Sequence, residues 1–183
     1  MSEIAERYRK VAGRFTERAK SVPDGAWDNP APCEGWVARD VVRHMVEWMP
    51  AFIVPRSGVD LPAGPSVDVD PAASWEVVSE SIQALLDDSA VASREYDTGA
   101  GPSTFEQDVD GFFIGDVLVH TWDLARATGL DDTLDADEVH RFLEAMAPHE
   151  EAMRKSGHYG ARVEVPDDAD EQTKLIAFSG RRV

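Results

Sequence analysis

Apolar residues recur at every third or fourth position in five stretches of the chain, which is the spacing of an amphipathic helix. In the first stretch Ile4, Tyr8, Val11 and Phe15 follow this spacing, and charged residues fill most of the gaps. The same pattern predicts a short sixth helix near the end of the sequence. The predicted helices cover residues 2–21, 37–52, 72–89, 113–129, 135–149 and 170–179.

The fifth helix has the clearest predicted beginning. Asp135 and Glu138 have the spacing of a capping box, in which each side chain accepts a backbone N–H of the first turn. Leu134 and Val139 occupy the two positions of a hydrophobic staple around the same turn. The sequence therefore places the first residues of this helix at about 135.

Segments rich in proline and glycine separate the predicted helices, and we expect loops over residues 27–35, 55–71 and 97–111. The second helix is predicted to stop before Pro55, because proline has no N–H for a helical hydrogen bond. Residues 162–165 have a strand-like composition, but no second clear strand is available to pair with them. We therefore predict an all-α fold in a single domain, residues 1–183, in which an antiparallel bundle contains one long crossover loop.

The charge balance excludes some classes of partner. The chain has 18 Lys and Arg residues against 35 Asp and Glu residues, a formal net charge of −17. Such a surface repels nucleic-acid phosphates and anionic membranes. Cys33 is the only cysteine, so no internal disulfide forms, and the sequence contains neither a signal peptide nor an apolar run long enough to span a membrane. A cytoplasmic protein is expected.

Two histidines lie within predicted apolar helices and are the strongest candidates for chemistry. His120 has Asp116 one turn before it and Asp123 one turn after it, and His44 has Asp40 at the same spacing. If a bundle brings these two helices face to face, two imidazoles and a carboxylate converge in the core. This donor set is typical of a divalent-metal site that keeps positions for water or substrate.

The spacing alone leaves a structural alternative open. The acidic content of the chain would produce about one acid-to-histidine pair of this kind by chance, and the sequence has two. Both histidines can therefore be residues of a helix flank whose neighbouring carboxylates satisfy them. Burial favours the metal, because an ionisable group on an apolar face needs a partner. The remaining three histidines lie among polar residues and are expected at the surface: His140, His149 and His158.

Two runs of sequence resemble a known family. Residues 113–129, FIGDVLVHTWDLARATG, and the segment from Trp27 through PCEGW to His44 are similar to signatures of an actinobacterial branch of the DinB-like superfamily. That branch is related to the N-terminal domain of mycothiol-dependent maleylpyruvate isomerase. Residues 160–181 also resemble its C-terminal segment, whereas residues 55–111 match only in pattern.

The resemblance implies a DinB-like antiparallel four-helix bundle with a long crossover loop and a short C-terminal extension. It also implies a metal held by His44, Asp116 and His120, with zinc or nickel expected. In the isomerase the acid is glutamate, and the aspartate of this chain is one methylene shorter. The isomerase also has a separate C-terminal domain for which this sequence has no room, so the isomerase activity itself is not expected.

The implied activity is that of a metal-dependent transferase or isomerase in which a small thiol such as mycothiol attacks an electrophile. The alternatives are a divalent-metal-binding or dimerisation module without turnover, and a helical scaffold with structural histidines. A homodimer is an expectation of the resemblance.

Several further residues near these positions have two possible roles each. Asp123 or Asp40 would orient a ligand imidazole or stay solvated, Glu47 would act as a base or stay solvated, and Cys33 would be a reactive thiol or a packed residue. Arg126 points away from the His120 face, towards the surface or an interface.

Overall fold

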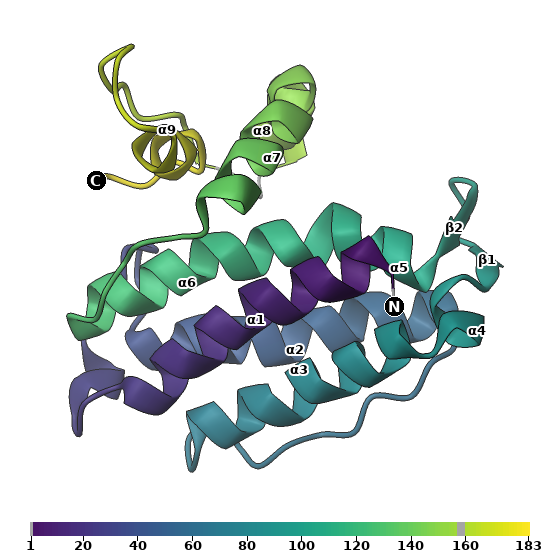
Figure 1. The fold of residues 1–183 in the computed structure, drawn as a ribbon. Coiled ribbons are helices and arrows are strands. Elements are labelled where there is room, and N and C mark those ends of the chain that lie inside the picture. The colour runs from purple at the N-terminus through teal and green to yellow at the C-terminus, as the bar shows by residue number, and fades with distance from the viewer. Residues whose placement is uncertain (1, 157–159) are drawn as a thin grey trace.

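The computed structural model describes residues 2–156 and 160–183, and it is mostly helical, as the sequence predicts. Four long helices pack side by side and enclose the apolar core (Figure 1). Each of them contacts two others, in the order α1, α3, α2, α6 and back to α1. These helices are α1 (Glu3–Ser21), α2 (Ala38–Ser57), α3 (Pro71–Asp87) and α6 (Ile114–Thr128).

The direction of the helices is not strictly alternating. Near the beginning of α1, Arg7 forms an ion pair with Asp110, just before α6. Near its end, Arg18 lies 3.3 Å from Asp131, just after α6. Helices α1 and α6 are therefore parallel, whereas the contacts at the site described below show that α2 and α6 are antiparallel. The expected antiparallel packing holds for the second pair and not for the first.

The second helix is longer than predicted and contains both Pro50 and Pro55. It ends at Gly58, whose positive φ of 68° and N–H bond to the Val54 carbonyl form a left-handed cap. Ile53 and Ser57 are buried in this part of the helix, and their packing outweighs the hydrogen bonds that the prolines remove. The expected crossover then covers residues 58–70 and leads to α3, which begins with an Asp70 cap.

The predicted loop over residues 97–111 is partly regular structure. A short helix, α4 (Ser89–Ala92), precedes an antiparallel hairpin of β1 (Glu95–Asp97) and β2 (Pro102–Thr104). Helix α5 (Phe105–Asp108) and a π-helical turn (Val109–Phe113) then lead directly into α6. Buried Asp108 fixes this region, since its carboxylate accepts hydrogen bonds from three side chains: Arg56, Tyr96 and Ser103. Strands this short have no periodicity that sequence reading can detect.

The C-terminal extension lies against α6 (Figure 1), and ion pairs join it to α1. It contains α7 (Ala136–Met146), a 3₁₀ turn (Ala147–His149), α8 (Glu150–Ser156) and α9 (Glu171–Phe178). Asp135 caps α7 as predicted, and the two staple residues are buried. The predicted capping box is incomplete, because the Glu138 carboxylate binds Arg7 of α1 instead of the helix backbone.

Two further predictions concern this extension. Residues 162–165 do not form a strand, since no extended segment among the described residues pairs with them, and Val163 donates its N–H to the Ala177 carbonyl. His140 and His149 are exposed, and His158 lies outside the described residues. Within the described ranges, none of the helices has the length and apolar character needed to cross a membrane.

Candidate metal centre

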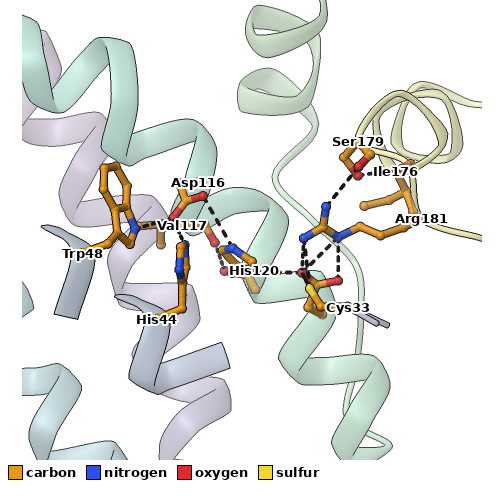
Figure 2. Close-up of polar contacts among 11 residues, drawn as sticks. Cys33, His44, Trp48, Asp116, Val117, His120, Ile176, Ser179 and Arg181 are labelled. Atoms are coloured by element: carbon orange, nitrogen blue, oxygen red, sulfur yellow. Dashed lines mark hydrogen bonds and ion pairs between the residues drawn. The ribbon is translucent and has the colours of Figure 1, made fainter. Parts of the chain in front are cut away.

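Two histidines and an aspartate meet where α2 and α6 cross the core. The imidazole rings of His44 and His120 lie 4.8 Å apart between centroids. His44 Nε2 is 3.4 Å from Asp116 Oδ2, and His120 Nε2 is 3.5 Å from Asp116 Oδ1 (Figure 2). The three residues that the sequence selects thus face one another, with one ligand atom of each inside a group no wider than 4.8 Å.

Helical periodicity places these side chains. Asp116 and His120 are four residues apart on α6, and His44 and Trp48 are four residues apart on α2, so each pair shares one helix face. The two faces meet with α2 and α6 running in opposite directions, since Phe52 of α2 contacts Phe112 just before α6. Along this seam the side chains change from aromatic pairs at one end to charged groups at the other.

Trp36 covers both imidazoles from the loop that precedes α2. Its ring centroid is 5.2 Å from that of His44 and 5.9 Å from that of His120, and it stacks nearly parallel to the latter. The loop is fixed by backbone hydrogen bonds and by Gly35, whose φ of 77° lies in the left-handed region. The PCEGW segment therefore positions an aromatic cover over the cluster.

The electrostatics of the cluster favour a cation at its centre. Burial raises the pKa of Asp116, but the charge of His120 and the hydrogen bonds from His44 and Trp48 outweigh it and lower the pKa. Trp48 Nε1 donates to Asp116 Oδ2 over 2.9 Å. In the described residues no lysine or arginine forms an ion pair with Asp116. An ionised carboxylate without such a partner, between two imidazoles, attracts a positive charge.

His120 holds that positive charge as a proton when no metal is present. Burial lowers the pKa of His120, but Asp116 and Asp123 oppose this effect and raise the pKa to about 10. The side chain is only 6% exposed, so its charge depends on these two carboxylates. A divalent cation that binds here must displace this proton.

A second group of polar residues continues from His120 towards the end of the chain. His120 Nδ1 lies 2.8 Å from Asp123 Oδ2, and Asp123 is completely buried. Arg181, which follows α9, binds the same carboxylate with Nε and Nη2, and Nη2 is also 3.3 Å from Cys33 Sγ (Figure 2). Burial raises the pKa of Asp123, but the hydrogen bonds from His120 and Arg181 lower it to about 2.

The residues His44, Asp116 and His120 fit a divalent metal by their spacing. Ligand atoms around a tetrahedral zinc, with bonds of about 2.0–2.1 Å, lie about 3.3 Å from each other. The distances of 3.4 Å from His44 Nε2 to Asp116 Oδ2 and of 3.5 Å from His120 Nε2 to Asp116 Oδ1 are close to this value. His44 is 30% exposed and Asp116 25% exposed, so one side of the group is open to solvent.

Cys33, His120 and Asp123 form a second group of possible ligands within the same 4.8 Å limit. This group is less suitable, because Asp123 already accepts two hydrogen bonds from Arg181 on one side. A metal at Asp123 would lie next to the guanidinium charge. The polar contacts therefore favour the group around Asp116.

The structure separates the other candidates from the centre. Asp40 accepts the Val37 N–H at the beginning of α2, whereas Asp123, the other acid weighed for orienting an imidazole, contacts His120. Glu47 is exposed, and Arg126 lies at the surface over the Trp122 ring, as expected. Cys33 is half-buried beside Asp123. Sequence reasoning missed Arg181, because no helical spacing connects it to the centre.

Fold and site together define an α-helical protein with a candidate metal centre at the seam between two core helices. The family model of the mycothiol maleylpyruvate isomerase N-terminal domain matches residues 8–125, and the chain belongs to this family. The match includes His44, Asp116 and His120, and it ends before Arg181.

Two relatives are known only as uncharacterized proteins of Mycobacterium tuberculosis: MT0763 of strain CDC 1551 / Oshkosh and Rv0738 of strain H37Rv. Each is 29% identical to this chain over 187 residues, and the alignment covers 96% of both partners. No solved structure matches the chain.

Proposed function

We propose that the chain is a metal-dependent enzyme in which a divalent cation, zinc or nickel, is held by His44, Asp116 and His120 of a DinB-like four-helix bundle. The observation that carries this proposal is the convergence of two imidazole nitrogens on one carboxylate at the spacing of metal ligands. Membership of the isomerase family supports a small thiol of the mycothiol type as one substrate and a small electrophile as the other.

In the proposed site the residues of the chain have different roles. His44, Asp116 and His120 supply the donor atoms, and Trp48 fixes the carboxylate by donating its indole N–H. Trp36 excludes water from one side of the imidazoles. When bound, the metal would lower the pKa of a thiol at an open position, so that the thiol reacts as its thiolate.

A metal-binding or dimerising module without turnover is the second candidate. It is favoured by the extent of the family match, because that family is defined by one domain of the isomerase. The enzyme and the metal-binding module use the same three ligands, so metal binding alone does not separate them. The homodimer is also a proposal, and sedimentation of the purified protein tests it.

Metal analysis and a thiol assay test the two candidates in turn. We expect about one zinc or nickel ion per purified chain, with the metal lost in His44→Ala and His120→Ala. His140→Ala is the matched control, because His140 is an exposed histidine that also lies 2.8 Å from a carboxylate, that of Glu171. The loaded protein is then mixed with mycothiol and a panel of electrophiles, and consumption of the thiol is measured.

The outcomes are distinct. Metal-dependent loss of thiol that His44→Ala abolishes supports the enzyme. A metal-loaded protein that is inert across the panel supports the module. Absence of metal from the wild type at neutral pH, even after incubation with zinc or with nickel, refutes the enzyme and the metal-binding module.

A further inference from the structure

The C-terminal segment reaches the metal centre through one side chain. Arg181 lies beyond the residues that match the family model, and its guanidinium forms a two-pronged contact with Asp123. Nε is 2.8 Å from Asp123 Oδ1, and Nη2 is 2.7 Å from Asp123 Oδ2. Asp123 Oδ2 in turn accepts from His120 Nδ1. An uninterrupted chain of contacts thus connects the end of the protein with a proposed metal ligand.

The backbone around Arg181 is held in place by contacts of its own. The Arg181 N–H donates to the Ile176 carbonyl of α9, and Nη1 donates to the Ser179 carbonyl. Gly180, immediately before it, has a φ of 87° and packs so closely on Gly160 that a Cβ would lie 2.9 Å from the Gly160 Cα. The guanidinium therefore approaches Asp123 from a fixed direction.

Asp123 needs this cation. Its side chain has no exposed surface, and a buried carboxylate is costly unless charge and hydrogen bonds compensate it. Arg181, which is 15% exposed, supplies that compensation, because its guanidinium stays charged and reaches both oxygens of the carboxylate.

The orientation of Asp123 decides which nitrogen of His120 is free. An ionised carboxylate only accepts hydrogen bonds, so the proton between Asp123 and His120 belongs to Nδ1. Nε2, the nitrogen that faces Asp116, is then the nitrogen that can offer a lone pair to a metal. The fork of Arg181 holds both carboxylate oxygens in the plane that makes this arrangement possible.

We propose that Arg181 is a positioning residue of the metal centre, which acts through Asp123 to hold the His120 imidazole with Nε2 directed at the metal. The inference rests on the metal site proposed above. It assigns a role in the centre to the C-terminal extension, so that the four helices alone do not complete the site.

The test measures zinc affinity by competition with a chromophoric chelator, together with the visible absorption spectrum of the cobalt-substituted protein. Arg181→Met removes the charge and keeps much of the length of the side chain, and Arg181→Lys keeps the charge without the fork. Arg126→Met is the matched control, because Arg126 is an exposed arginine of the same helix as Asp123 and pairs with Asp132. The unfolding temperature of each metal-free variant is measured in parallel.

We expect Arg181→Met to raise the zinc dissociation constant about 10- to 100-fold, the usual effect of removing a residue that orients a ligand histidine. Arg181→Lys should restore part of the affinity, the cobalt spectrum of Arg181→Met should change, and Arg126→Met should match the wild type. A lower unfolding temperature with an unchanged dissociation constant and cobalt spectrum would mean a merely structural role and would overturn the proposal.

A second variant keeps the proposal testable if Arg181→Met does not fold. The double variant Asp123→Asn with Arg181→Met leaves no unpaired buried charge at this position, and the introduced amide oxygen would still accept from His120 Nδ1 without being oriented. We expect this variant to fold and to bind zinc about 10-fold or more weakly than the wild type. Wild-type affinity in the double variant would overturn the role of Arg181. Failure of the wild type to bind zinc would instead refute the metal site itself, and the inference with it.

Discussion

Two clusters of charged side chains connect the C-terminal extension to the helical bundle, and they differ in how their charges are balanced. In the first, between α1 and α7, Arg7 binds Glu138 and Asp110, and Lys10 binds Asp135 at 2.8 Å. Each carboxylate therefore meets a lysine or arginine. This cluster is complete without any further ion.

In the second cluster, between α6 and the end of the chain, only one of the two carboxylates is balanced in this way. Asp123 meets Arg181, but Asp116 meets two imidazoles and an indole. Unlike an arginine, an imidazole can exchange its proton for a metal ion. A site for a metal thus differs from a structural ion cluster by its exchangeable positive charge.

The largest expected effect is the response of the second cluster to zinc. At a free zinc concentration of about 1,000 times the dissociation constant, binding should stabilise the fold by about 4 kcal/mol. His120→Ala should abolish this stabilisation, whereas Arg7→Ala, in the first cluster, should show all of it from a lower starting point. Thermal unfolding with zinc and with a chelator measures the difference. Equal zinc responses of wild type and His120→Ala would remove the distinction between the clusters.

The next largest effect is expected from a substitution that breaks the first cluster. Arg7→Ala leaves Glu138, which is 4% exposed, without its two-pronged partner. Breaking a buried pair in this way should lower the free energy of unfolding by about 3 kcal/mol, and the dissociation constant for zinc should not change. Urea denaturation of the metal-free protein gives the first value, and chelator competition gives the second. A substantial loss of zinc affinity would show that the two clusters are coupled.

A smaller effect comes from pH, because the metal-free fold keeps a proton on His120 that the unfolded chain releases at about pH 6.5. With a folded pKa of about 10, this contribution is complete below about pH 6.5 and disappears as the pH rises through 10. Between pH 7 and 9 the metal-free protein should therefore lose about 2 kcal/mol of stability or less.

Zinc affinity should change in the opposite direction over the same range, because zinc competes with the proton. His120→Gln is the control for the stability measurement, since its stability should depend less on pH. Parallel pH profiles of wild type and His120→Gln, followed by urea denaturation, would contradict the assignment of the proton to His120.

The smallest effect is expected at Cys33, where the two groups of possible ligands differ. Cys33→Ser retains a donor to Asp123 and should change stability by less than about 1 kcal/mol. Zinc affinity should remain close to that of the wild type, because the structure favours ligands around Asp116. If the zinc dissociation constant instead increases strongly, the metal lies between Cys33, His120 and Asp123.

The local features of the chain can be predicted from the sequence. Apolar periodicity predicts five long helices, and their approximate positions are confirmed. The same periodicity placed Asp116 and His120 on one face and made them candidates with His44. Predictions failed where tertiary packing overrides a local rule, as at Pro55 inside α2, or where an element is too short to have a period, as in the hairpin.

The sequence by itself determined the helices and the side chains that share a face, because these depend on spacings of three or four residues. Only the tertiary structure decided which faces meet. It alone showed that α1 and α6 are parallel, that Glu138 binds Arg7 rather than its own helix, and that Arg181 binds the carboxylate of Asp123. Contacts between residues far apart in the chain depend on the balance of burial and charge over the whole fold. A local sequence pattern does not determine that balance, so it cannot predict these contacts.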